Sequence, residues 1–146
     1  MRVMGLDYGD ATMGVAMSDE MLIIAQPLET IRREKANQLR KTYQRIEELI
    51  KEYDVKEIVL GLPLNMNDTK GTRALICEGV GRDIERRTGI KVTMWDERLT
   101  TVAAHEILDE AELNYKDKAK VVDKIAAAII LQGYLDRKKE EENGKR

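Results

Sequence analysis

Acidic residues occur at three separated places in this chain of 146 residues where their side chains could reach a common cleft. Asp7 follows a short apolar run, the pair Asp96-Glu97 follows another, and Asp123 precedes a long apolar segment near the C-terminus. Carboxylate oxygens suit Mg²⁺ or Mn²⁺, whereas one cysteine and one histidine are too few nitrogen and sulfur ligands for a typical zinc site. If the three places converge, we expect a site for Mg²⁺ or Mn²⁺.

Such a site could hydrolyse phosphodiester bonds. Two divalent ions about 4 Å apart can activate a water molecule and stabilise the leaving oxygen. Gly5 and Gly9 flank Asp7, and positions without a Cβ let an anion or a neighbouring backbone come close. Lys70 and Arg73 lie in and just after a predicted loop, from which they could contact phosphates or merely solvate the loop.

Each acid also has a purely structural interpretation. Asp7 could form an Asx-turn, and Asp123 could pair on the helix surface with Lys120, three residues earlier. Glu97 could simply pair with Arg98, and Asp96 could be a turn residue. The conjunction of the acids favours the metal site more than any one of them does.

The hydrophobic pattern predicts an α/β fold with a mixed five-stranded sheet and helices packed on its faces. The predicted strands are Arg2–Leu6, Thr12–Met17, Met21–Thr30 with Pro27 near an edge, Lys56–Gly61 and Ile90–Trp95. The predicted helices are Lys35–Tyr53, Arg73–Thr88, a third from Thr100 or Thr101 to Ala111, and Lys118–Leu135. Residues 1–136 form one predicted domain, and the charged tail 137–146 is expected to fray.

This order of elements can bring the acids together. Ligands gather beyond the carboxyl ends of parallel strands, so Asp7 and Asp96-Glu97 would share one edge if their strands are neighbours. Asp123 would join them if the final helix crosses that edge. His105, on the predicted third helix, could assist proton transfer or be an ordinary surface histidine.

Composition limits the classes of partner. Twenty-five basic and 27 acidic residues give a net charge of -2, which argues mildly against a general nucleic-acid binder. Phenylalanine is absent and aromatic residues make up 4% of the chain, so base stacking is not expected to be the main mode of binding. The single Cys77, the lack of a signal peptide and the lack of a membrane-spanning run predict a cytoplasmic protein.

Several motifs, in order along nearly the whole chain, resemble the YqgF/RuvX family. They are Gly5-Leu6-Asp7-Tyr8-Gly9, Gly14-Val15-Ala16, Ser18-Asp19, Gly61-Leu62-Pro63-Leu64-Asn65, Asp96-Glu97-Arg98-Leu99-Thr100-Thr101 and Val122-Asp123-Lys124-Ile125-Ala126-Ala127. These bacterial proteins are described as Holliday junction resolvases, or as nucleases that process the 5′ end of pre-16S ribosomal RNA.

The resemblance implies an RNase H-like fold and metal-dependent phosphodiester hydrolysis. It assigns the metal-holding, catalytic acids to Asp7, Glu97 and Asp123, with Asp96 as the alternative to Glu97. It implies a nucleic-acid partner, either a ribosomal RNA precursor or branched DNA, and Lys70, Arg73 and Arg98 are the predicted contacts to it. Both a monomer and a homodimer stay open.

Two other interpretations compete with the nuclease. Gly-x-Asp-x-Gly near a first hairpin also resembles the phosphate loop of the sugar kinase and actin superfamily, but those enzymes enclose ATP between two such domains and this chain supplies one. The second alternative is a non-catalytic nucleic-acid or ribosome-assembly binding module on the same fold. The presence of all three acids argues against it.

Overall fold

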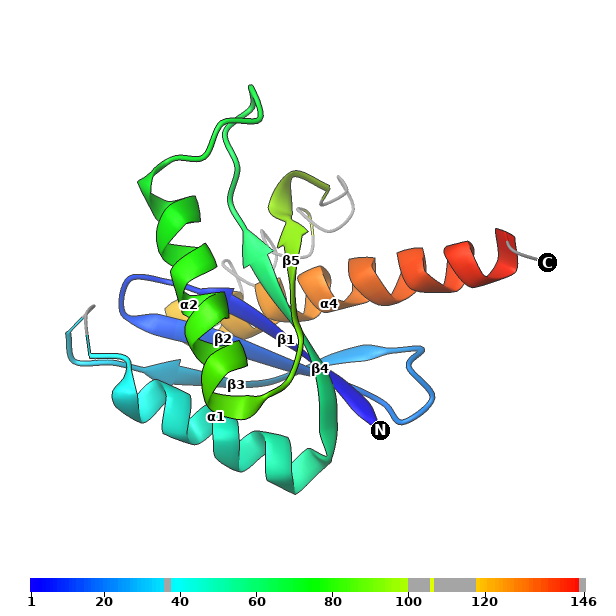
Figure 1. Ribbon diagram of the computed structural model, residues 1–146, viewed down its shortest axis with the longest axis horizontal. Coiled ribbons are helices and arrows are strands. Elements are labelled where there is room, and N and C mark those ends of the chain that lie inside the picture. The colour runs from blue at the N-terminus through cyan, green and yellow to red at the C-terminus, as the bar shows by residue number, and fades with distance from the viewer. Residues whose placement is uncertain (36–37, 100–105, 107–117, 145–146) are drawn as a thin grey trace.

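A five-stranded mixed sheet forms the centre of the molecule (Figure 1). The computed structural model describes residues 1–35, 38–99, 106 and 118–144. Its elements are β1 (Arg2–Tyr8), β2 (Thr12–Ser18), β3 (Ala25–Arg32), α1 (Arg40–Tyr53), β4 (Val55–Leu62), α2 (Thr72–Thr88), β5 (Val92–Asp96), a short 3₁₀ turn (Glu97–Leu99) and α4 (Lys118–Gly144). The strand order is β3-β2-β1-β4-β5. The first three strands are antiparallel, and β1, β4 and β5 run parallel, which confirms the predicted mixed sheet.

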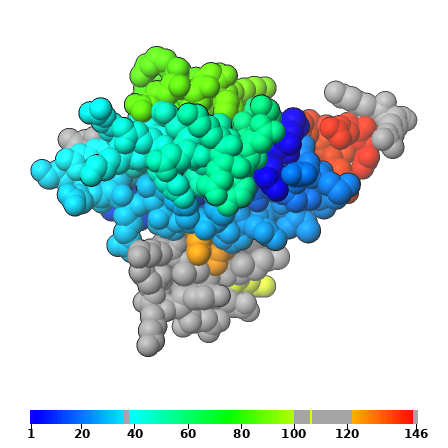
Figure 2. Space-filling view, turned by 90° about the horizontal axis from the view of Figure 1, so that it is seen from below, coloured from blue at the N-terminus to red at the C-terminus, as the bar shows by residue number. Residues whose placement is uncertain are grey.

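The helices cover both faces of the sheet. Helices α1 and α2 lie on one face and α4 lies on the other, so the strands form a middle layer (Figure 2). Alternate residues of β1 serve the two cores: Met4 and Leu6 pack beneath α1 and α2, whereas Val3 packs beneath α4. Side chains two residues apart on a strand point to the same face of the sheet, so the Asp7 side chain points, like that of Val3, to the face that α4 covers.

Glycines allow α4 to approach the sheet closely. A Cβ added to Gly5 would lie 2.7 Å from the Cβ of Leu131, and one added to Gly14 would lie 2.0 Å from the carbonyl oxygen of Asp123. Gly14 is paired with Asp7 in the β1–β2 ladder. The Gly-Val-Ala motif therefore leaves the space in which the start of α4 packs against the site.

The edge strand β3 begins later than the sequence pattern predicts. It starts at Ala25 instead of Met21, because the Asp19 carboxylate accepts hydrogen bonds from the backbone N–H groups of Ile23 (2.7 Å) and Ile24 (3.0 Å). These bonds hold residues 19–24 in a turn and withhold them from the ladder.

The last helix is longer than predicted, and the prediction of a frayed tail from residue 137 is wrong for the described part of that segment. Helix α4 continues past Leu135 to Gly144. Lys138 Nζ lies 3.2 Å from Glu57 Oε2, and the Arg137 guanidinium lies over the Trp95 ring. Contacts to Glu57 and Trp95 thus hold the end of α4 against the sheet, although its many charged residues are typical of a solvated tail.

Two further predictions concern the connections. Helix α1 begins at Arg40 instead of near Lys35, and ahead of it the Gln38 N–H donates a hydrogen bond to Lys35 O (3.0 Å). Of the predicted third helix, from Thr100 or Thr101 to Ala111, the structure describes only Glu106, which is helical, and His105 lies outside the described residues. No helix in the described part of the chain is long and apolar enough to cross a bilayer.

Replacing Gly14 with alanine should destabilise the protein. The new Cβ would overlap the Asp123 backbone, so strand or helix must shift, and we expect the free energy of unfolding to fall by about 1–3 kcal/mol. Urea unfolding followed by circular dichroism measures this. Gly79→Ala is the matched control: its Cβ would come no closer than 3.8 Å, to Arg82 Nη2, and alanine favours a helix by up to about 1 kcal/mol. Equal stabilities of the two variants would contradict the close approach of α4.

Candidate active site

Two of the predicted acids, Asp7 and Glu97, are in contact at the carboxyl ends of the parallel strands. Their side chains share a hydrogen bond. Glu97 opens the 3₁₀ turn that follows β5, and its carboxylate lies back over Gly61, where an added Cβ would be 2.7 Å from Glu97 Oε1. The missing side chain at Gly61 leaves the room that the Glu97 carboxylate uses to reach Asp7.

This contact changes the protonation of Asp7. Burial, the charge and hydrogen bond of Glu97, and then the charge of Asp123 raise the pKa of Asp7 well above its ordinary value, while nearby Arg73 lowers it. The Asp7 carboxyl group is only partly exposed, so water screens the repulsion poorly. A proton between Asp7 and Glu97 relieves the repulsion, and a bound cation could do the same.

Asp123 lies beside this pair but is held by a different partner. Thr12 Oγ1 donates a hydrogen bond to Asp123 Oδ2. Within the residues that the structure describes, no three acidic, histidine or cysteine side chains gather closely enough to hold a metal ion. The structure therefore brings Asp7 and Glu97 together and leaves Asp123 at their side, near enough to raise the pKa of Asp7.

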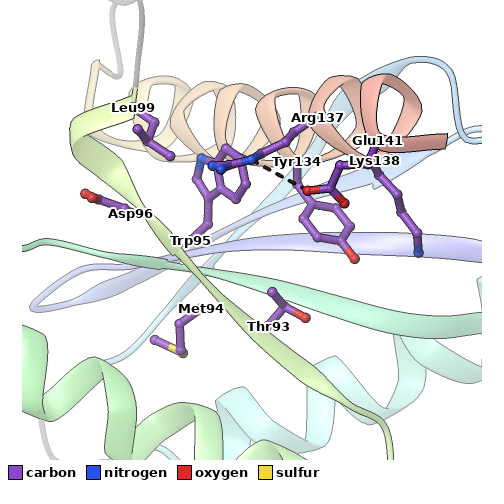
Figure 3. Close-up of a pocket in the computed structure, with 9 residues that line it drawn as sticks. All are labelled: Thr93, Met94, Trp95, Asp96, Leu99, Tyr134, Arg137, Lys138 and Glu141. Carbon is purple, nitrogen blue, oxygen red and sulfur yellow. Dashed lines mark ion pairs between the residues drawn. The ribbon is translucent and has the colours of Figure 1, made fainter. Parts of the chain in front are cut away.

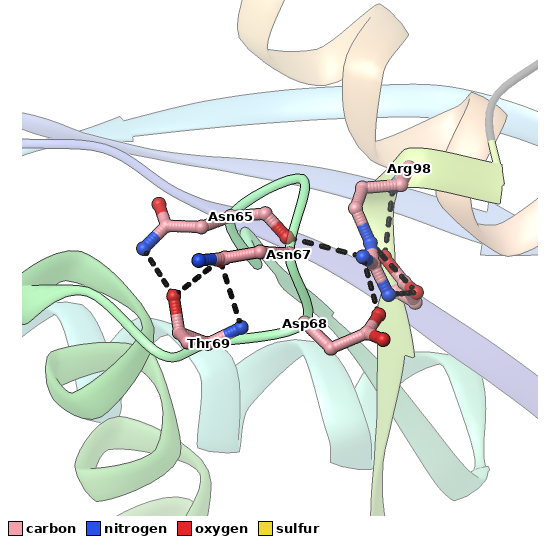
Figure 4. Close-up of polar contacts among 6 residues, drawn as sticks. Asn65, Asn67, Asp68, Thr69 and Arg98 are labelled. Atoms are coloured by element: carbon pink, nitrogen blue, oxygen red, sulfur yellow. Dashed lines mark hydrogen bonds and ion pairs between the residues drawn. The ribbon is translucent and has the colours of Figure 1, made fainter.

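Arg98 ties the turn that follows β5 to the loop that follows β4 (Figure 4). Its guanidinium donates to Asp96 Oδ2 (2.8 Å), to Asp68 Oδ1 (2.7 Å) and to the carbonyl oxygen of Asn65 (3.1 Å). The hydrogen bond and charge of Arg98 lower the pKa of Asp96. Asp96, the alternative metal ligand, is thus already bound to Arg98. The contacts of Arg98 hold the turn that carries Glu97 in place.

Arg73 and Lys70, the other two predicted nucleic-acid contacts, differ in position. Arg73 reaches the end of β1, where it donates to Tyr8 O (3.3 Å) and pairs with Asp10 (3.0 Å), and 48% of its side chain stays exposed. Lys70 pairs with Glu78 at 2.9 Å, on the exposed surface of the β4–α2 connection. Of the two, Arg73 is the one whose charge acts on Asp7.

Arg33 is a residue that the sequence pattern did not single out. It is buried, its guanidinium lies over the Tyr8 ring with the two centres 4.8 Å apart, and it donates to the carbonyl oxygens of Gly9 and Thr12. These contacts fix the turn between β1 and β2, which lies next to Asp7. In the sequence Arg33 belongs to a charged run, which is more typical of a solvated surface.

Comparison with known proteins shows the family to which the chain belongs. The family model described as "RuvX: Holliday junction resolvase" matches residues 1–137. The chain belongs to the RuvX family. A relative from Lachnospira eligens, named "Putative pre-16S rRNA nuclease", is 54% identical over 138 residues, covering 94% of this chain and 99% of the relative. A relative of the same name from Bacillus cereus is 49% identical over 140 residues, covering 94% of this chain and all of the relative.

Solved structures support the fold of this RuvX-family protein. RuvC of T. thermophilus, in a complex with a Holliday junction substrate, superposes with a TM-score of 0.61 at 15% identity, over 95% of this chain and 96% of the RuvC chain. RuvC has an RNase H-like fold, so the predicted fold is confirmed. The chain is a member of a nuclease family, whose reaction is hydrolysis of phosphodiester bonds.

The raised pKa of Asp7 predicts a pH-dependent loss of stability without metal. Because folding raises this pKa, the stability contributed by Asp7 is full below its ordinary value of 3.8 and is lost as the pH rises through the folded value. Asp7→Asn should therefore raise the free energy of unfolding at pH 7, by about 1.4 kcal/mol for every tenfold change in the proton affinity of Asp7 on folding.

Urea unfolding in EDTA, from about pH 3.5 to about pH 8, measures the difference between the two proteins. The gap should widen toward neutral pH. Glu20→Gln serves as the control, since that side chain is 73% exposed and should change the stability by less than about 0.5 kcal/mol. A gap that stays constant with pH would show that Asp7 does not titrate as its surroundings imply.

Proposed function

We propose that this RuvX-family chain is a Mg²⁺- or Mn²⁺-dependent nuclease in which Asp7, Glu97 and Asp123 hold the metal. The observation that carries the proposal is the contact between Asp7 and Glu97, two partly buried carboxyl groups at the carboxyl ends of parallel strands. Structural salt bridges join opposite charges, whereas this site joins like charges, as cation-binding sites do.

The residues present fit a hard divalent ion. The donor atoms are carboxylate oxygens. Burial and the charges of nearby Glu97 and Asp7 raise the pKa of Cys77 in α2 to about 11, so its thiol stays protonated and does not compete as a ligand. An ion bound by Asp7 and Glu97 would displace their shared proton into solvent, and Asp123 would join as a ligand by giving up its hydrogen bond from Thr12. When bound, the ion supplies an activated water and stabilises charge on the phosphate.

The proposed substrate is structured RNA, at the 5′ end of the 16S ribosomal RNA precursor, in the cytoplasm. Relatives that share about half of the sequence over nearly its whole length are named "Putative pre-16S rRNA nuclease", which supports the choice of this RNA. Lys70 and Arg73 would contact phosphates on the rim beside the acids, and Arg98 would contribute mainly by holding the Asn65–Lys70 loop. Such contacts position the backbone without selecting a sequence.

Cleavage of three matched substrates tests this choice. We expect an RNA hairpin with a 5′ extension to be cut faster than a single strand of the same extension and faster than a four-way DNA junction, in Mg²⁺ or Mn²⁺. Faster cutting of the junction would assign branched DNA as the substrate. No cutting of any of the three would refute the nuclease for these substrates and favour a binding module.

Removing any of the three acids should abolish cleavage. We expect Asp7→Asn, Glu97→Gln and Asp123→Asn each to lower the cleavage rate of the hairpin by at least about 100-fold, because each removes an oxygen ligand that water replaces poorly. Glu20→Gln is the control: its carboxylate is 73% exposed, pairs only loosely with Arg2 at 3.7 Å, and should leave the rate unchanged.

Circular dichroism and a Mn²⁺ titration by calorimetry accompany these rates. Folded variants that lose both Mn²⁺ binding and cleavage support the assignment. Cleavage that survives all three substitutions would end it, and Mn²⁺ binding that does not depend on these carboxylates would place the metal elsewhere.

Arg73→Ala should weaken binding of the same RNA hairpin about tenfold at 0.1 M salt, by loss of one charge-assisted contact to phosphate. The slope of log K against log salt should become shallower by about 1, and to a similar degree for RNAs of unrelated sequence. Fluorescence anisotropy at several salt concentrations measures both quantities. Arg86→Ala, 75% exposed and paired with Asp83 near the other end of α2, should change neither. A slope that Arg73→Ala leaves unaltered would remove Arg73 from the interface.

A further inference from the structure

A pocket of about 350 Å³ lies between the edge strand β5 and the C-terminal half of α4 (Figure 3). The only tryptophan of the chain forms part of it. Its main lining side chains are Trp95, Tyr134, Arg137, Lys138, Asp96 and Glu141. Pockets of this size are large enough for a small planar ligand. The functional assignment above makes no use of it.

The two aromatic rings of the pocket are held in fixed orientations. Trp95 and Tyr134 are perpendicular to each other, with ring centres 6.0 Å apart. The Tyr134 hydroxyl donates to Glu57, and the indole packs on α4 at Gly133, where an added Cβ would lie 3.3 Å from it. A planar ligand that stacks here would meet preformed walls, so little side-chain entropy would be lost on binding.

The ring of Trp95 is covered by a side chain that can leave easily. The Arg137 guanidinium lies over the indole, 5.9 Å from the ring centre, and its ion pair with Glu141 is long, at 3.8 Å. Both of these charged side chains are mostly exposed, at 59% and 66%, so breaking their ion pair costs little. Arg137 could therefore swing outward and give its place on the indole to another flat, polarisable group.

The charges of the pocket favour a base over a bare phosphate. Both of its cations are paired with a carboxylate, Arg137 with Glu141 at 3.8 Å and Lys138 with Glu57 at 3.2 Å, and Asp96 is paired with Arg98 at 2.8 Å. A balanced lining attracts free anions weakly. Aromatic walls with carboxylates beside them suit a nucleobase, which stacks by its faces and presents N–H donors at its edge.

The pocket and the acids share the α4 face of the sheet. Gly61, above which the Glu97 carboxylate lies, is paired with Trp95 in the β4–β5 ladder. Strands are spaced about 4.8 Å apart, so the backbone of Trp95 lies roughly 10 Å from β1, the strand that carries Asp7. An extended nucleic-acid strand with a phosphate at Asp7 could thus place a nearby base at Trp95.

We propose that this pocket binds the base of an unpaired nucleotide close to the phosphate that is cleaved, by stacking on Trp95. The inference rests on the proposed nuclease function and adds a binding site for single-stranded substrate to it. It also explains how a chain with few aromatic residues could use stacking: two of them, far apart in sequence, meet at one place next to the acids.

Fluorescence of Trp95 tests the proposal directly, because no other tryptophan contributes to the emission. The probe is an RNA hairpin with a 5′ extension, titrated into the Asp7→Asn protein so that binding is measured whether or not the wild type cleaves. We expect the emission to be quenched in parallel with binding measured by anisotropy. A hairpin whose extension is abasic keeps the phosphates, so it should still bind but leave the emission unchanged.

Substitution at the pocket gives a second readout. Trp95→Leu should weaken binding of the extended hairpin about five- to a hundredfold without altering the salt dependence, since a stack carries no charge. It should leave binding of the abasic hairpin unchanged, which separates a lost stack from a damaged fold. Tyr53→Leu, at a partly buried aromatic residue that packs in the core of the opposite face, is the matched control and should alter neither affinity.

RNA binding without quenching of Trp95, or equal quenching by the abasic hairpin, overturns the base pocket and leaves the proposed nuclease untouched. Failure of the wild-type protein to cleave, with Trp95 still quenched, refutes the nuclease and leaves the pocket in place. An extended hairpin that does not bind at all also overturns the pocket, and the cleavage assay then decides the fate of the nuclease separately.

Discussion

The contact between Asp7 and Glu97 is the interaction on which the arrangement of the site depends. Like charges in a partly buried place repel strongly, and neither side chain is free to withdraw. Asp7 is fixed by a central strand, and Glu97 is fixed by a turn that Arg98 ties to the neighbouring loop. The fold therefore maintains an unfavourable pair that a proton relieves and that a divalent cation would relieve better.

Close packing of α4 on the sheet is the second constraint, and the two are connected. The helix lies near enough to clash with any side chain at Gly5 or Gly14, so those positions decide how near Asp123 comes to Asp7. The same helix, eleven residues further on, supplies Tyr134 to the aromatic pocket. One rigid element thus spans both the acids and the pocket, and a shift of α4 would move them together.

Local signals in the sequence predicted most of the framework. Each strand of the parallel part was predicted from its apolar residues, which are continuous before Gly61 and alternate with polar residues over Ile90–Trp95. Gly89, with a φ of 73°, ends α2 where the pattern indicated. Asp7 and the pair Asp96-Glu97 were candidates because they follow such strands, and the resemblance to the RuvX family favoured Glu97 over Asp96. These features depend on neighbours in the chain, and a sequence pattern records such neighbours directly.

Features that depend on distant partners could not be predicted in the same way. Arg98 looked like a phosphate contact, but its guanidinium is engaged by Asp68 and Asp96. Composition argued against stacking, yet it cannot show that Trp95 and Tyr134 meet.

The distribution of charge has a consequence for how substrate and metal would bind. The chain carries a net charge of -2, and the acids would repel a polyanion that approached them without a cation. Arg73 is the exposed cation that acts on Asp7, and it is partly neutralised by Asp10.

An ion bound by Asp7 and Glu97 would reverse the local sign of the potential, so the metal ion and the RNA would each strengthen the binding of the other. By linkage this coupling is reciprocal: the factor by which the metal tightens RNA binding must equal the factor by which RNA tightens metal binding. A balanced surface with one acidic site can thus recognise nucleic acid without the basic face of a general binder.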